Sequence, residues 1–129
     1  MKKVLSLSFV AILILVFTGC GKQAQPPLYS WGNYVNSSTE YGMKGHEKEV
    51  LEKHMQELEK IINDSEAKNQ RVAPGIYAEY GQILYETNKK EDAKKYFLLE
   101  KQTYVESSMF IDRVMTKLYG ETIWKKLAI

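Results

Sequence analysis

Apolar side chains recur at helical spacing through the middle of the chain. Between residues 45 and 69 they occupy positions i, i+4, i+7 and i+11, which share one face of an α-helix: Leu51, Met55, Leu58 and Ile62. Val50 and Ile61 widen this stripe, and Glu and Lys residues cover the other faces. The pattern predicts an amphipathic helix whose charged side is a solvated surface.

Two further helices are predicted over residues 74–87 and from the turn at residues 88–90 to about residue 104. The first carries Ile76, Tyr77, Tyr80, Ile83 and Leu84, and the second carries Ala93, Tyr96, Phe97 and Tyr104. Pro74 suits the first turn of a helix, where its missing N–H costs little. Because the connecting turn is short, the two helices should be antiparallel neighbours. Gly81 costs about 1 kcal/mol relative to Ala inside a helix, and a close contact between the two helices would explain it.

A fourth helix is predicted after residue 106, where Ser107 and Ser108 offer N-caps. Its core face would consist of Phe110, Ile111, Val114, Met115 and Leu118. Gly120 would end it, and residues 121–129 would add a last turn carrying Trp124 and Leu127. No stretch alternates convincingly with a period of two. We therefore expect an all-α domain, a small antiparallel array of about four helices.

The chain begins with the three-part layout of a secretory signal. Met1-Lys2-Lys3 is a short positive region, an apolar run follows over residues 4–17, and the run meets Thr18-Gly19-Cys20. The run spans about 14 residues, whereas a membrane-spanning helix needs about 20. We predict a cleaved signal peptide over residues 1–19, a lipidated tether over 20–28 and one helical domain over 29–129.

Phe17-Thr18-Gly19-Cys20 resembles the bacterial lipobox, in which a small residue precedes a cysteine that is acylated and becomes the new N-terminus. Gly19 fits the small position, while Phe17 departs from the usual Leu. Cys20 is the only cysteine, which excludes an intramolecular disulfide. Two acyl chains, such as palmitate, anchor a protein stably where one does not. The alternative is an ordinary signal peptide with an incidental cysteine.

Cleavage would also change the charge. Removing Lys2 and Lys3 takes away the whole formal net charge of +2, so no electrostatic case for nucleic acid remains. By resemblance to the sorting rule of enteric bacteria, Gly21 in place of Asp favours the outer membrane, facing the periplasm.

Tyr29, Trp31 and Tyr34 form an aromatic cluster directly after the tether. One interpretation is that the rings pack the leading segment onto the helices. The other is an exposed platform on which a sugar or peptide stacks.

The pair of helices over residues 74–104 resembles the tetratricopeptide repeat, a helix–turn–helix unit. Tyr77 and Gly81 fall at its aromatic and small positions in the first helix, and Ala93 and Phe97 fall at the corresponding positions in the second. Leu84, Glu100 and Val105 depart from the pattern. One repeat is rarely stable alone, so flanking helices should cover it.

The mature chain also resembles the small bacterial lipoproteins classed as domain of unknown function 4810. The resembling residues are Tyr29-x-Trp31-Gly32-x-Tyr34, Pro74-Gly75, Gly81, Phe97-x-x-Glu100-Lys101, Glu106-Ser107 and Phe110. The resemblance implies a lipid-anchored helical module, often encoded beside a lipoprotein resembling the curli export pore. It implies no biochemical activity.

No catalytic constellation stands out. His46 and His54 are the only histidines, and eight residues on one helix separate them by about 12 Å, too far to share a metal unaided. We expect His54 to have a packing or boundary role. Cys20 is consumed by lipidation, and no G-x-S-x-G, P-loop or H-E-x-x-H pattern occurs. We expect no enzyme, cofactor, metal or small-molecule substrate.

A protein-binding role is the favoured hypothesis. In tetratricopeptide proteins the first helix of each repeat lines a groove for helices or extended peptides. Carried onto this chain, those positions are Ala78, Gln82 and Tyr85, with Glu86 beside them. The chain would be an accessory subunit of an outer-membrane lipoprotein complex, held at the membrane through Cys20. The alternatives are a cell-wall lipoprotein with a sugar platform at Trp31, and a small enzyme.

Overall fold

The computed structural model describes residues 26–120, which form five α-helices and one 3-10 turn without any strand in that range. The helices are α2 (Tyr34–Lys44), α3 (Lys48–Ala67), α4 (Ile76–Glu86), α5 (Lys90–Thr103) and α6 (Ser108–Tyr119), and η1 (Val105–Ser107) precedes α6. The predicted signal peptide, Cys20, Gly21, Trp124 and Leu127 lie outside the described residues. The all-α prediction is confirmed.

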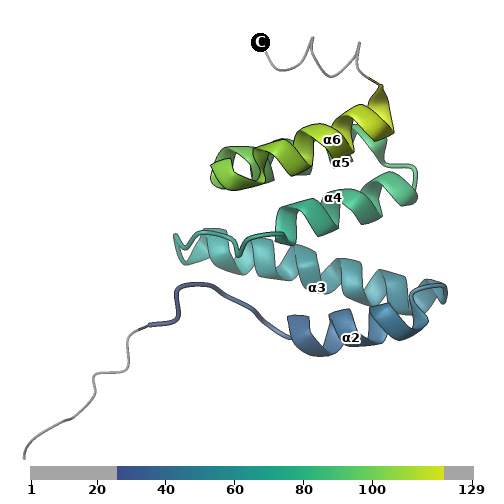
Figure 1. The fold of residues 1–129 in the computed structure, drawn as a ribbon. Coiled ribbons are helices and arrows are strands. Elements are labelled where there is room, and N and C mark those ends of the chain that lie inside the picture. The colour runs from purple at the N-terminus through teal and green to yellow at the C-terminus, as the bar shows by residue number, and fades with distance from the viewer. Residues whose placement is uncertain (1–25, 121–129) are drawn as a thin grey trace, which may run out of the picture.

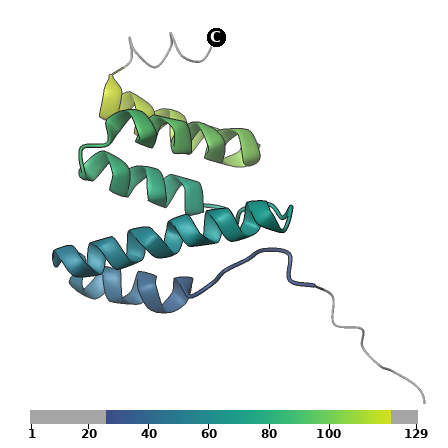
Figure 2. The ribbon, with the colours of Figure 1, turned by 180° about the vertical axis from the view of Figure 1, so that it is seen from behind.

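The helices stack in chain order, with α2 at one end and α6 at the other (Figures 1 and 2). The expected antiparallel pair corresponds to α4 and α5, which form the most extensive helix contact. The apolar core runs through four helices and the segment between α3 and α4: Leu58, Ile61, Ile62, Val72, Ala73, Ile76, Tyr77, Tyr80, Ile83, Leu84, Ala93, Phe97, Ile111 and Met115.

The structure contains one helix that the sequence pattern did not predict. This helix, α2, was missed because it carries no apolar stripe. Its sequence is mostly polar, and none of its residues is buried. Tyr34 and Tyr41 only partly bury their rings against the core. An apolar period of 3.6 residues reveals a helix only where one face is apolar, so this pattern could not predict α2.

The buried face of α3 differs from the predicted stripe. The buried side chains are Val50, His54, Leu58, Ile61, Ile62 and Ser65, while Leu51 and Met55 are only half-buried. The buried face of α3 is therefore rotated by about one residue from the predicted stripe. The difference arises because the buried face includes two polar side chains, His54 and Ser65, which the apolar pattern could not identify.

The start of α6 also corrects the prediction. Neither serine caps the helix through its side chain, and Ser107 instead hydrogen-bonds Glu100. Phe110 is 60% exposed and does not belong to the core face, which Ile111 and Met115 form. Phe110 lies about 100° around the helix from buried Ile111, at the edge of the apolar stripe, so its side chain remains outside. Gly120 does end the helix, with φ +81°.

Candidate functional site

The three residues proposed for partner binding lie on α4, where internal contacts already use them. Gln82 Nε2 donates a hydrogen bond to Glu86 Oε1 at 2.7 Å. The Tyr85 hydroxyl donates to the Leu118 carbonyl at 3.0 Å, and its ring meets Tyr119 edge-on. Tyr85 therefore ties α4 to α6, whereas Gln82 and Glu86 pair with each other on the surface of α4.

The residues expected to pack the repeat come together where α4 crosses α5. Tyr77, Gly81, Ala93 and Phe97 are all buried. A Cβ on Gly81 would lie 3.2 Å from both the Ala93 carbonyl oxygen and a Phe97 ring carbon. An alanine there would have to displace the Ala93 carbonyl or the Phe97 ring slightly.

A buried polar network joins α2, α3 and α4, and its centre is His54. This side chain is 1% exposed. Its Nε2 donates to Glu79 Oε1 at 2.9 Å, and its Nδ1 hydrogen-bonds Ser37 Oγ at 3.0 Å. The Tyr34 hydroxyl donates to the other Glu79 oxygen at 2.8 Å, and the Tyr41 ring stacks on the imidazole with centroids 4.7 Å apart.

The electrostatics of this network favour an ionised Glu79. Burial opposes ionisation, but the hydrogen bonds from His54 and Tyr34 outweigh it, so the pKa of Glu79 lies below its ordinary value. Burial and the neighbouring carboxylate raise the pKa of Tyr34 to about 12. Every polar group at the centre of the network has a partner. It resembles a structural clamp more than a reactive site.

The sequence predicted a packing or boundary role for His54 but did not identify its partners. Glu79 and Ser37 look like ordinary polar residues of their helices, and no spacing rule joins positions on three helices. A histidine within an apolar stripe was the one available signal.

Glu100 is a second buried carboxylate that the sequence did not single out, and it is 2% exposed. Its Oε1 accepts hydrogen bonds from the Gly75 N–H at 2.9 Å and from Ser107 Oγ at 3.3 Å. Gly75 is the N-cap of α4 and has φ +88°. Glu100 thus fixes the start of α4 and the η1 corner to α5. The tetratricopeptide pattern commonly has a small residue at this position. A glutamate in its place was the one sequence signal that could have marked Glu100 as buried.

The aromatic cluster divides into packed and exposed rings. Tyr29 and Tyr34 partly pack against the core, whereas Trp31 is 44% exposed. Trp31 contacts both tyrosines, with centroids 6.2 and 5.6 Å away. It borders an open hollow of about 690 Å³ whose polar lining includes Lys60 and Gln70.

The polar groups of this hollow mostly bind one another. Ser30 Oγ donates to Gln70 Oε1 at 2.8 Å, Gln70 Nε2 donates to the Pro27 carbonyl at 3.1 Å, and Lys60 pairs with Asp64 at 2.6 Å. The bonds of Ser30 and Pro27 fasten the leading segment to Gln70, just after the end of α3.

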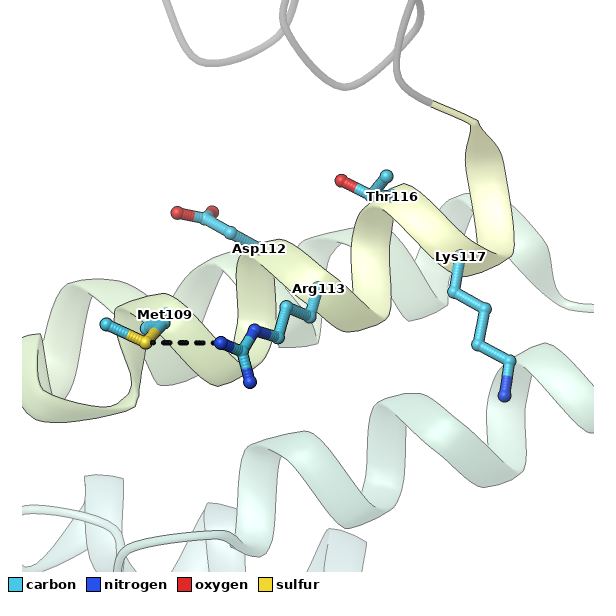
Figure 3. A pocket seen from close by; sticks show the side chains of 5 residues that line it. All are labelled: Met109, Asp112, Arg113, Thr116 and Lys117. Atoms are coloured by element: carbon cyan, nitrogen blue, oxygen red, sulfur yellow. Dashed lines mark hydrogen bonds between the residues drawn. The ribbon is translucent and has the colours of Figure 1, made fainter.

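The far end of the stack exposes apolar residues on and beside α6. Val105 is 78%, Met109 68% and Phe110 60% exposed. An open hollow runs along α6 (Figure 3), and its lining residues are Met109, Asp112, Arg113, Thr116 and Lys117. Lys101 of α5 pairs with Asp112 at 2.6 Å and fixes the edge of this face.

Neither a metal centre nor a membrane span occurs in the part of the chain that the structure describes. No His, Cys, Asp and Glu side chains between residues 26 and 120 gather in a group of three or more that would hold a metal ion. Over the same range, no helix has the length and apolar character needed to cross a membrane.

Comparison with known proteins gives one match. Neither a curated protein nor a solved structure matches the chain. One family model, described as a domain of unknown function (DUF4810), matches residues 28–114, which is more than half of the chain and includes α2 to α5 and part of α6. The chain therefore belongs to the DUF4810 family.

Proposed function

We propose that this protein is a lipid-anchored protein of the bacterial envelope that acts as a protein-binding accessory subunit. Exposed apolar residues at the η1–α6 corner carry the proposal, because Val105 and Phe110 remain 78% and 60% exposed beside a well-packed core. Apolar side chains that gather at one corner of a small domain are typical of interaction sites. The lipobox-like segment at Cys20 supports an anchor, most simply in the outer membrane facing the periplasm.

The corner supports partner binding better than α4 does. Tyr85 and Gln82 have internal hydrogen-bond partners, whereas most of the Phe110 surface is open to solvent. The partner we expect is another envelope lipoprotein, and the sequence resemblance points to one similar to the curli export pore.

Crosslinking in native membranes tests this role. We expect a Val105→Ser/Phe110→Ser variant to lose the envelope protein that crosslinks to the wild type. Val35→Ser/Met43→Ser is the matched control, because these apolar residues of α2 are 71% and 69% exposed at the other end of the stack. The same partner with unchanged yield in the corner variant would refute the binding site. Cys20→Ala separately tests the anchor, since it should release the protein from membranes.

Exposed Trp31 supports a second candidate function, a sugar platform for the cell wall. An aromatic face beside hydroxyl, amide and charged groups is suited to stacking on a sugar ring. We expect Trp31→Ala to abolish sedimentation with purified peptidoglycan if this function holds. The comparison variant is Val35→Ala, which removes another exposed apolar side chain near the same end. Equal sedimentation of both variants would exclude the platform.

A further inference from the structure

Two exposed cations extend the apolar corner along α6. Arg113 and Lys117 follow Met109 at successive i+4 positions, so the three side chains form one row on the helix, the α6 row. All three are exposed, and they border the open hollow of about 720 Å³ along α6. Arg113 Nη2 donates to the Met109 sulfur at 3.7 Å (Figure 3). The apolar corner is therefore continuous with the cations.

The positive charge of the α6 row is not balanced within the described fold. Between residues 26 and 120, no carboxylate lies within ion-pair distance of Arg113 or Lys117. Asp112 is the acidic residue beside them on α6, and it pairs with Lys101 of α5 at 2.6 Å. The surface therefore presents uncompensated positive charge next to exposed apolar side chains.

A partner complements this surface when it carries carboxylates beside apolar side chains. From Met109 to Lys117 the chain advances about 12 Å along the helix, or about two turns. An amphipathic helix presents groups at this spacing from one side, with apolar anchors at one end and acidic residues one and two turns further along.

We propose that the corner and the α6 row together dock an amphipathic helix of a partner protein, with its apolar side chains against Val105, Met109 and Phe110 and its acidic residues against Arg113 and Lys117. This inference rests on the proposed protein-binding role and adds the chemistry of the partner.

A bilayer with anionic lipids offers similar chemistry, but the position of α6 favours a protein. The described chain begins beside the α2 end of the stack, and α6 is at the other end (Figure 1). The proposed anchor at Cys20 is at most about 21 Å from Pro26, because an extended chain spans about 3.5 Å per residue. Each pair of packed helices adds about 8–10 Å. An anchor at Cys20 therefore keeps the α2 end nearer the membrane than α6.

Photocrosslinking in native envelopes tests the acidic partner. Benzoylphenylalanine in place of Phe110 puts the reactive group beside the α6 row and does not depend on lysine chemistry. We expect Arg113→Glu/Lys117→Glu to lower the yield of the linked partner about tenfold, because attraction becomes repulsion. The matched control is Lys44→Glu/Lys48→Glu, which makes the same change in net charge at two exposed lysines of the α2–α3 end. It should leave the yield unchanged.

Two further measurements sharpen the test. Arg113→Gln/Lys117→Gln removes the charges without adding repulsion and should give an intermediate yield. Higher salt should weaken the wild-type link and have little effect on this variant, because salt screens exposed charges. Mass spectrometry of the linked segment should find Asp or Glu beside apolar residues.

Equal yields in the Arg113→Glu/Lys117→Glu variant and its control would overturn the acidic partner. If Val105→Ser still abolished the link, the corner would remain a protein-binding site, so the proposed function would survive that result. A wild-type chain that links to phospholipid and to no protein would instead show membrane docking and would refute both the acidic helix and the proposed partner.

Discussion

The α4–α5 pair and the α2–α3 pair differ in what holds their helices together. In the first pair, a glycine lets the backbones approach and Phe97 fills the space beside it. In the second, α2 contributes no buried residue. Hydrogen bonds that join Tyr34 to Glu79 and Ser37 to His54 fasten it to the stack. Apolar packing is non-directional and spread over many atoms, whereas the network depends on a few groups in fixed geometry.

The difference implies unequal local stability. Elements with few buried apolar contacts open at lower free energy than the rest of a fold. We therefore expect α2 to detach before α4 and α5 separate, and the following changes test that order.

Phe97→Ala should have the largest effect. It removes a fully buried ring from the α4–α5 contact and should cost about 3–5 kcal/mol of unfolding free energy. Denaturant unfolding followed by circular dichroism measures the loss, which should affect the whole domain in one transition. Loss of α5 structure alone, with α2 and α3 intact, would contradict the single core.

Glu79→Ala should come next and should act mainly on α2. It leaves buried His54 without its carboxylate and the Tyr34 hydroxyl without an acceptor, at a cost of about 1–3 kcal/mol. Hydrogen exchange should show faster exchange in Tyr34–Lys44 and little change in Ile76–Glu86 or Lys90–Thr103. Glu59→Ala is the control, because Glu59 is an exposed residue of α3. Equal effects of the two substitutions would show that the network does not hold α2.

Gly81→Ala and Gly42→Ala form a matched pair with opposite expected signs. Both gain helix propensity of about 1 kcal/mol. At Gly42 a Cβ meets nothing within 4 Å, so α2 should be stabilised, while at Gly81 it meets backbone oxygen and the Phe97 ring at 3.2 Å. We expect Gly81→Ala to lower Tm despite its propensity gain. A rise at both positions would mean that α4 and α5 can move apart without cost.

The smallest effect should be a dependence on acidic pH. The pKa of Glu79 lies below its ordinary value of 4.5 in the fold, so its contribution is present above that value. It is lost as the pH falls through the lower, folded-state pKa. Fluorescence of Trp31, which contacts Tyr34 at the start of α2, should report this loosening in a chain whose second tryptophan is removed by Trp124→Phe. Glu79→Gln should flatten the profile, and an unchanged profile would assign the dependence to another group.

Part of this molecule follows from local pattern. The apolar period of α3, the short link at Asn88 and the mid-helix glycine predict an all-α array with α4 against α5. Sequence periodicity could not identify α2, because a mostly polar helix has no apolar period. It also misplaced Phe110, because the apolar pattern does not show which edge of a stripe the neighbouring helices cover.

The candidate sites were less predictable than the fold. The sequence marked Trp31, Tyr85 and His54 as residues of interest, but their exposure and partners arise from contacts between distant segments. Tyr85 reaches the Leu118 carbonyl 33 residues away, and His54 reaches Glu79 across 25 residues. A hydrogen bond of this kind needs both groups at a fixed distance and angle, which no local pattern specifies.

The sequence by itself determined helical class, the close contact at Gly81 and membership in the family that matches residues 28–114. These follow from spacing, side-chain size and shared motifs, which act locally along the chain. Only the tertiary structure decided that His54 and Glu100 are buried beside hydrogen-bond partners from other elements. It also decided that the side chains of Val105 and Phe110 are exposed to solvent. Burial depends on how the helices stack and rotate against one another, and that arrangement is a property of the whole chain.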